Sequence, residues 1–149
     1  MTTPETRSDP ALASALRISV SRLARRLRAE REAHGLQPEL SDTQIGALAT
    51  LERKGAMTPG ELADHEKVQP PSMTRVIAVL EQRGLVMRAA HATDKRQVVL
   101  TVTDEGREVV HQSRRLREAW LARRLRELSP QERAKLRAAA PILEKLSQS

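Results

Sequence analysis

The stretch that decides the fold is Gln69-Pro70-Pro71-Ser72-Met73-Thr74-Arg75, which is followed after an apolar run by Asp94-Lys95-Arg96. Adjacent prolines fit only in the first turn of a helix, where the donors that they lack would be unpaired anyway. A helix is therefore expected to begin near Gln69 and to end at Gly84. Its buried face is expected to consist of Met73, Val76, Ile77 and Leu80.

Two runs of apolar and β-branched residues, 85–88 and 97–102, follow this helix. The residues between them, 91–95, are polar and favour turns, so the sequence predicts an antiparallel hairpin. The tip of the hairpin carries the charged triplet 94–96.

Helix start signals mark the rest of the chain. Ser8-Asp9-Pro10 predicts a helix capped by Asp9 that runs to about Gly35. Ser41 with Gln44 is a capping-box pattern for a helix that ends at Lys54-Gly55, and Thr58-Pro59-Gly60-Glu61 starts the next helix.

After the hairpin, Thr103 is expected to cap a long helix with an acidic first turn, which continues to about Leu128. Ser129 with Glu132 then forms a second capping box, and the last helix contains Pro141, which is expected to bend it. The fold class is therefore mainly α with a small β-hairpin.

The net charge of +7 points to an anionic partner, either nucleic acid or a lipid surface. A solvated, arginine-rich surface is the alternative. No segment approaches about 18 uninterrupted apolar residues, and the start of the chain is polar, so we expect no membrane span, no secretory signal and a cytoplasmic location. The chain has no cysteine, which excludes disulfides and thiolate metal sites within it.

The chain has one tryptophan, Trp120, and neither phenylalanine nor tyrosine. An aliphatic core of this kind favours interlocked helices. It also argues against single-strand binding, which depends on aromatic stacking platforms. Trp120 itself is expected to be a core or interface anchor.

A short helix followed by a cationic hairpin suits the two grooves of a DNA duplex, because the helix fits the wide groove and the hairpin fits the narrow one. Short polar side chains at the start of the helix can reach base edges, and Arg75 can contact guanine or phosphate. Simple capping by Gln69 and Ser72 is the alternative. The candidate contacts on the helix are Gln69, Pro70, Pro71, Ser72, Thr74 and Arg75.

At the hairpin, Arg96 is the candidate for insertion into the minor groove, and Asp94 is expected to aim its guanidinium. The alternative is a solvated turn with a surface ion pair. The candidate contacts on the hairpin are Arg88, Asp94, Lys95 and Arg96.

The segment 62–106 resembles the core of the MarR family of bacterial transcriptional regulators, and the flanking helices match that family's architecture over nearly the whole chain. The resemblance rests on residues 73–75, 80–86, 94–96 and 102–106. Gln69 stands where the family often has serine or threonine.

The resemblance implies one domain: a winged helix-turn-helix lobe over 36–103, with N- and C-terminal dimerisation helices over 9–35 and 104–149. It implies a homodimer on a pseudo-palindromic DNA site, repression by occlusion of a promoter, and release by a small anionic or phenolic effector bound between the two regions. Apolar stripes on the first and last helices independently favour dimerisation.

A basic RNA-binding or nucleoid-coating protein remains the alternative function. An enzyme is not supported, because no nucleophile constellation or phosphate-binding glycine loop is present. The histidines lack metal-ligand spacing, so no metal or cofactor is expected. The arginines on the long helix are expected to form a solvated face, partly neutralised by Glu118 and Glu127: Arg114, Arg115, Arg117, Arg123, Arg124 and Arg126.

Overall fold

A computed structural model describes residues 9–33 and 40–149, the side chain of Glu32 excepted. The elements follow the order α1 (Asp9–Ala33), α2 (Asp42–Lys54), α3 (Pro59–Glu66), α4 (Pro70–Gln82), β1 (Val86–Ala90), β2 (Val98–Val102), α5 (Asp104–Arg126) and α6 (Pro130–Ser147). The predicted fold class is confirmed: the described chain is mainly helical and carries a two-stranded antiparallel hairpin.

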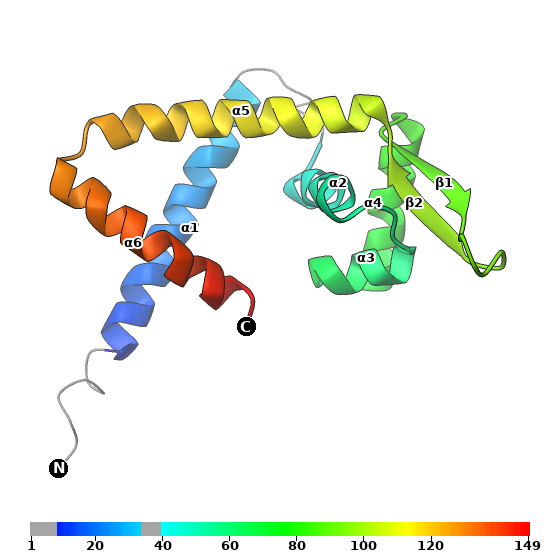
Figure 1. Cartoon of the computed structure of the whole chain (residues 1–149), viewed down its shortest axis with the longest axis horizontal. Coiled ribbons are helices and arrows are strands. Elements are labelled where there is room, and N and C mark those ends of the chain that lie inside the picture. The colour runs from blue at the N-terminus through cyan, green and yellow to red at the C-terminus, as the bar shows by residue number, and fades with distance from the viewer. Residues whose placement is uncertain (1–8, 34–39) are drawn as a thin grey trace, which may run out of the picture.

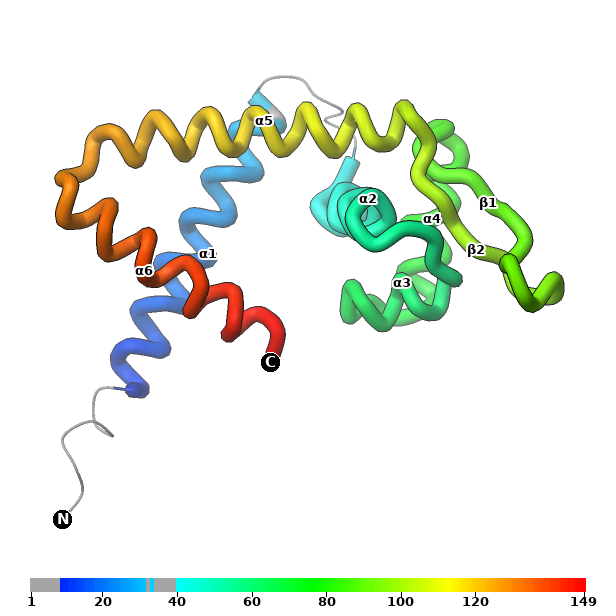
Figure 2. Tube along the Cα trace, in the orientation of Figure 1, coloured from blue at the N-terminus to red at the C-terminus, as the bar shows by residue number. Residues whose placement is uncertain are grey.

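Helix α5 forms a long bar that joins two unlike parts of the molecule (Figure 1). Helices α2, α3 and α4 and the hairpin gather below one end of this bar, while α1 and α6 lie below the other part (Figures 1 and 2). We call the first group, 40–103, the lobe, and α1 and α6 the terminal helices.

The lobe contains one aliphatic core. Fully buried leucines from three elements meet there, namely Leu48 of α2, Leu62 of α3 and Leu80 of α4. The predicted inner face of α4 is confirmed, since Met73, Val76, Ile77 and Leu80 are all buried. Leu100 of β2 and Val110 of α5 close the core, so the hairpin and the first turns of α5 are fixed to the helices.

Four predicted caps are present. The hydroxyls of Ser41, Thr58, Thr103 and Ser129 each accept a hydrogen bond from the backbone amide three residues later. In the capping boxes, the side chains of the partner residues Gln44 and Glu132 also accept from the cap backbone amides. Because each cap satisfies donors that the helix itself leaves unpaired, these helix starts are encoded locally.

Some predicted boundaries were wrong by one or two residues. Asp9 is the first helical residue of α1 and not its cap, and Ser8 and Gly35, near which we placed the start and the end of this helix, lie outside the described residues. Helix α5 ends at Arg126 and not at Leu128, whose carbonyl instead accepts a hydrogen bond from the Arg133 guanidinium at 2.8 Å.

The hairpin strands are also shifted relative to the prediction. Leu85 lies in the turn after α4 and not in the strand, and its amide donates to the carbonyl of Leu80 at 2.9 Å. Strand β1 instead extends to Ala90, which pairs with Val98. Gly84, with φ of 71°, adopts the left-handed conformation predicted for it.

One sheet contact was not predicted. Met57, between α2 and α3, forms an antiparallel bridge with Leu100, and each backbone amide donates to the other residue's carbonyl, at 3.2 and 2.7 Å. The bridge ties the hairpin to the helices from the side opposite β1.

The terminal helices differ from the lobe in burial. Helix α6, which is described throughout, contains no buried residue, and it continues through Pro141 to Ser147. None of the described helices has both the length and the apolar character needed to span a bilayer. Large apolar side chains are exposed on both terminal helices: Leu12, Ile18, Val20, Leu23, Leu136, Ile142, Leu143 and Leu146.

Candidate nucleic-acid interface

The start of α4 presents polar side chains and prolines to solvent. While Met73 is buried, all six predicted contact residues on this helix are exposed: Gln69, Pro70, Pro71, Ser72, Thr74 and Arg75. The other end of α4 adjoins α5, where the Thr103 hydroxyl donates to the carbonyl of Gly84 at 2.7 Å. The exposed start of α4 therefore lies roughly 20 Å, the length of the helix, from the end that adjoins α5.

Gln69 occupies the N-cap position, but within the described chain its side chain makes no capping hydrogen bond. Its amide is therefore available for another partner. The Thr74 hydroxyl donates to the carbonyl of Pro70 at 3.0 Å, which fixes its rotamer and leaves its lone pairs open.

The hairpin loop is built around Asp94. Its carboxylate Oδ1 accepts a hydrogen bond from the backbone amide of Arg96 at 3.1 Å and lies 3.4 Å from the Arg96 Nε. The Arg96 side chain is 93% exposed, whereas that of Asp94 is 37% exposed. Asp94 therefore orients a guanidinium that projects into solvent from the loop.

His91 is a part of this loop that the sequence analysis did not identify. Its Nδ1 accepts hydrogen bonds from the backbone amides of Thr93 and Asp94 at 3.2 and 3.1 Å. The amide of His91 donates to the carbonyl of Gln97 at 3.0 Å, which closes the loop. The signal in the sequence was a side chain with an acceptor atom that precedes, by two and three residues, the backbone amides that it binds. This spacing is similar to that of an Asx turn.

Arg88 lies on β1, away from the loop. Its Nε contacts Glu81 of α4 at 2.5 Å, and half of its side chain is exposed. Arg88 therefore links the hairpin to the helix and keeps part of its guanidinium accessible. Lys95 and Arg96 are the exposed cations of the loop itself.

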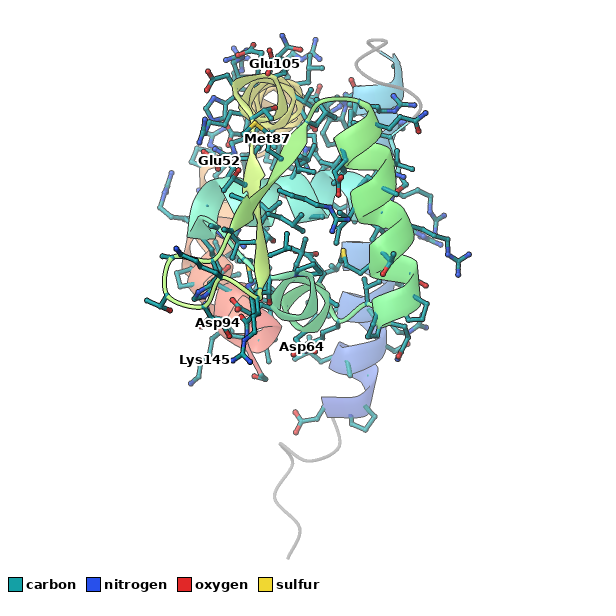
Figure 3. All side chains as sticks on the ribbon, turned by 90° about the vertical axis from the view of Figure 1, so that its right-hand side faces the viewer. Glu52, Asp64, Met87, Asp94, Glu105 and Lys145 are labelled. Atoms are coloured by element: carbon teal, nitrogen blue, oxygen red, sulfur yellow. The ribbon has the colours of Figure 1, made fainter. Side chains whose placement is uncertain are left out.

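Figure 3 looks along the long axis of the molecule from the side of the hairpin, with Asp94 at the hairpin loop and Met87 on β1. Glu105, at the start of α5, lies at the other end of the hairpin from Asp94. The hairpin loop and the start of α4 thus project from the side of the lobe away from α5, and the predicted contact residues of the loop and the helix share that side.

The arginines of α5 are mostly exposed, as expected for a solvated face. Several are ion-paired: Arg115 with Glu108 at 3.1 Å, and Arg124 with Glu127 at 3.0 Å. Arg114 lies 3.6 Å from Glu52 of α2, and His111 lies 3.2 Å from the same carboxylate. The hydrogen bond from His111 and the charge of Arg114 lower the pKa of Glu52, although partial burial opposes this.

Trp120 is buried between helices α1 and α5. The guanidinium carbons of Arg26 and Arg124 lie 5.5 and 5.6 Å from the centre of its ring, within cation–π distance. The expectation that Trp120 anchors packing, and is not a ligand platform, agrees with its 7% exposure.

A pocket of about 270 Å³ lies where α1, α2 and α5 meet. Asp42, the first residue of α2, contacts Arg28 at 3.0 Å and Arg31 at 3.1 Å. Arg117 of α5 lines the same pocket, and burial together with the charges of Arg31 and Arg114 lowers the pKa of its guanidinium. This pocket could not be predicted from local sequence patterns, because its cations come from helices far apart in the chain.

Among the described residues, no group of three or more histidine, aspartate or glutamate side chains is placed to hold a metal ion.

The MarR family model matches residues 40–98, which cover most of the lobe. An HTH-type transcriptional regulator of Mycobacterium tuberculosis is 48% identical over 136 residues, which are 91% of this chain and 92% of that protein. The HTH-type transcriptional repressor MdtR of Bacillus subtilis is 29% identical, over 96% of this chain and 90% of that protein.

A solved structure of a MarR family protein from Bacillus stearothermophilus superposes with a TM-score of 0.82, covering 99% of this chain and 100% of that one, at 22% sequence identity. This likeness supports the winged-helix fold. MarR family proteins are DNA-binding transcriptional regulators and not enzymes, and they typically act as dimers. The exposed helix start, the projecting hairpin and the end-to-end similarity to the mycobacterial regulator agree, and the chain belongs to the MarR family of DNA-binding transcriptional regulators.

Proposed function

We propose that this protein is a dimeric repressor that acts in the cytoplasm on a pseudo-palindromic duplex site. The winged-helix lobe spans 36–103, and the helical regions 9–35 and 104–149 form the dimer. The observation that carries the proposal is the pairing of an exposed polar helix start with an arginine that Asp94 holds outward from the hairpin. Residues 36–39 of this lobe lie outside the described part of the chain.

In this proposal α4 enters the wide groove. The side-chain amide of Gln69, which makes no capping hydrogen bond, forms hydrogen bonds with an adenine edge. Arg75 forms hydrogen bonds with guanine or a phosphate. Ser72 and Thr74 reach neighbouring base edges or phosphates. The rings of Pro70 and Pro71 cannot donate hydrogen bonds, but they can pack against a thymine methyl group.

The hairpin loop follows the adjacent minor groove. Arg96 enters the groove, where narrow A·T-rich DNA concentrates negative potential, and Lys95 contacts the backbone. Asp94 faces Arg96 and so holds the guanidinium without approaching the phosphates itself. Arg88 contributes from β1, where its ion pair with Glu81 keeps the hairpin at a fixed distance from α4.

A two-fold dimer through the terminal helices covers their exposed leucines and places two copies of α4 on successive turns of the duplex. Such a dimer blocks a promoter by occupying it. The name of the relative MdtR, a transcriptional repressor, supports this direction of regulation. The alternative of a basic RNA-binding or nucleoid-coating protein finds no support among the relatives.

The experiment is selection of bound sites from a random duplex pool, followed by titration of the selected site with Arg75→Ala. Loss of a base contact is expected to weaken binding by about 1–3 kcal/mol, and only at sequences that carry the contacted base. Arg115→Ala is the matched control, because it removes the same charge from an exposed position on α5.

A pool that yields no enriched sequence would contradict the proposal and favour the nucleoid-coating alternative. An Arg75→Ala loss that is equal for all sequences would assign Arg75 to a phosphate. Binding as tight as that of the parent protein would remove Arg75 from the interface.

We also propose that a small anionic or phenolic effector binds the α1–α2–α5 pocket and releases the protein from DNA. The pocket supports this because arginines from two helices meet there beside the apolar side chains of Leu27 and Ile45, at the junction of the lobe with the terminal helices. Its volume is at the small end of ligand sites in proteins, so a single-ring compound fits it best. Isothermal titration with benzoate and phenol, each followed by DNA titration, tests this second role.

A further inference from the structure

We propose that His91 is a positioning residue for DNA binding, because its neutral imidazole holds the hairpin loop in the form that presents Arg96. A proton on the acceptor nitrogen releases the loop, so the contribution of the hairpin to DNA affinity is lost as the pH falls. The inference rests on the proposed contact of Arg96 with the minor groove. It goes beyond that contact, since it gives His91 a role and makes the contact depend on pH.

The first argument is that His91 completes a closed set of hydrogen bonds. Its Nδ1 accepts from the backbone amide of Asp94 at 3.1 Å, and the carboxylate of Asp94 accepts from the amide of Arg96, also at 3.1 Å. The carbonyl of Asp94 accepts from the amide of Gln97 at 3.0 Å, and the carbonyl of Gln97 accepts from the amide of His91 at 3.0 Å. The imidazole therefore holds the backbone of Asp94, whose side chain holds Arg96.

The second argument is that little else fixes the loop. Residues 91–97 contain neither glycine nor proline, the residues that most strongly set the conformation of a turn. None of these described residues belongs to the buried core of the lobe. Most of their side chains are exposed: Ala92, Thr93, Lys95, Arg96 and Gln97. The conformation of the loop therefore depends on its own hydrogen bonds.

The third argument is the chemistry of the acceptor. The backbone amide of Thr93 donates to the same Nδ1 at 3.2 Å, and the Thr93 hydroxyl lies 3.3 Å from it. Backbone amides only donate, so Nδ1 must be unprotonated and the proton of the neutral ring must lie on Nε2. Protonation turns Nδ1 into a donor that faces two other donors, and both hydrogen bonds are lost. Histidine is the side chain that makes this change between about pH 5 and 8.

The charges around the ring add an effect of the opposite sign. In Figure 1 the loop lies apart from α2 and α5, and its own charged residues are Asp94, Lys95 and Arg96. Helices α3 and α4 pack against the strands, and their charged residues are Glu61, Asp64, His65, Glu66, Arg75 and Glu81. A proton on His91 adds a positive charge beside the cations of the loop, which by itself favours binding to phosphates. Loss of the loop geometry weakens binding, so the sign of the pH dependence decides between the two effects.

The test measures the affinity of the full-length protein for its selected duplex, by polarisation of the labelled DNA, at about pH 8 and about pH 5.5. The salt concentration is kept constant, because salt alone changes DNA affinity. We expect the wild-type protein to bind about fivefold more weakly at the lower pH, the effect of losing the net contribution of one hydrogen bond. Circular dichroism at both pH values establishes that the protein is folded.

Two substitutions of His91 separate positioning from direct contact. His91→Asn keeps an acceptor that can bind the amides of the following residues in an Asx turn, and it does not titrate. It should retain the affinity that the wild type has at the higher pH and should not respond to pH. His91→Ala lacks the acceptor and should bind about fivefold more weakly at both pH values.

His111→Gln is the matched control, because it removes a titrating imidazole that also makes a side-chain contact, at 3.2 Å to Glu52, but lies on α5. This variant should keep the pH response of the wild type. A response that is lost in His111→Gln and kept in His91→Asn would contradict the proposal.

Arg96→Ala separates this inference from the proposed contact with DNA. Because His91 acts through Arg96, Arg96→Ala should lose the pH response, and adding His91→Ala to it should weaken binding no further. If Arg96→Ala binds as tightly as the wild type, the proposed contact fails and this inference fails with it. If Arg96→Ala binds weakly but acidification strengthens binding by the wild type, the contact stands and the role of His91 is wrong.

Discussion

The lobe and the terminal helices are built from similar amino acids but differ in what covers their apolar side chains. In the lobe, leucine, isoleucine, valine and methionine from three helices and a hairpin enclose one another almost completely. In α6, Leu136, Ile142, Leu143 and Leu146 are 40–61% exposed. The lobe is therefore stabilised by its own core, whereas the terminal helices present a surface suited to a second copy.

The largest expected effect is a loss of stability where the lobe packs against α5. A Cβ at Gly106 would lie 2.3 Å from the carbonyl oxygen of Leu85 and 2.7 Å from a methyl carbon of Val102. Because backbone must move to relieve this contact, Gly106→Ala is expected to lower the free energy of unfolding by about 3 kcal/mol or more. Urea denaturation followed by circular dichroism measures the change.

Gly60→Ala is the control for this prediction, since Gly60 lies in α3 and no atom approaches its Cβ position within 4 Å. It should be neutral or should stabilise the protein by a few tenths of a kcal/mol up to about 1 kcal/mol. Equal stability of the two variants would show that the α4–α5 junction is not tightly packed.

The next prediction tests whether dimerisation through the terminal helices can be lost while the lobe stays folded. Leu143 and Leu146 of α6 flank an apolar groove with Leu16 and Val20 of α1. Leu143→Glu should weaken dimerisation by about 2 kcal/mol or more per protomer, because it replaces buried apolar area by a charge. The lobe should remain folded. Light scattering and denaturation measure the two quantities separately, and Lys135→Glu on the same helix is the control for changed charge.

A monomeric wild-type protein in light scattering would contradict the interpretation of the terminal helices as a dimer surface. Loss of lobe stability in Leu143→Glu would instead show that the two regions fold as one unit.

A smaller effect concerns the hairpin loop, the part of the lobe that does not rely on the core. Arg96→Ala and Asp94→Ala should each weaken DNA binding about tenfold, or ~1.4 kcal/mol, and the double variant should lose less than the sum. Duplexes whose flanks are changed from A·T to G·C should bind the wild type more weakly.

Pairing Asp94→Ala with Lys95→Ala provides the control, because the described contacts of the Asp94 side chain go to Arg96, so these two losses should add. If the losses of DNA affinity in Asp94→Ala and Arg96→Ala add, and affinity does not depend on the flanks of the site, the contact between the two residues is an ordinary surface ion pair.

The smallest effect lies on α5, where the two regions meet. The Ser113 hydroxyl is buried and has no hydrogen-bond partner within the described part of the chain. Ser113→Ala should therefore raise the free energy of unfolding by about 1 kcal/mol in urea denaturation. Ser19→Ala removes an exposed hydroxyl that donates a hydrogen bond to the carbonyl of Ala15, and it should change the free energy of unfolding little. Destabilisation by Ser113→Ala would indicate that the dimer supplies the missing partner.

The limits of sequence-based prediction follow the same division between local and distant contacts. The starts of α2, α3, α5 and α6 were predictable because a cap acts within three residues. The end of α4 was predictable because glycine tolerates the positive φ that the turn after the helix requires. The bridge from Met57 to Leu100 and the pairing of Arg88 with Glu81 were not predicted, since each depends on how separate elements pack.

The candidate contacts of α4 and the hairpin were named from local chemistry, and their exposure is consistent with that interpretation. The pocket was not found, because Arg31, Asp42 and Arg117 come together only through packing of α1, α2 and α5. His91 was placed in the predicted turn and considered only as a metal ligand, for which it lacks the spacing, whereas its Nδ1 accepts the backbone hydrogen bonds that shape the loop.

The placement of Trp120 also gives the molecule a convenient optical property. The chain holds a single indole and no other aromatic ring of the phenylalanine or tyrosine type, so its near-ultraviolet emission comes from one site. That site lies between a guanidinium on α1 and another on α5, and nearby positive charge shifts the energy of the excited indole. The emission wavelength of the unlabelled protein therefore reports on one helix contact, between α1 and α5, the helix that carries the lobe.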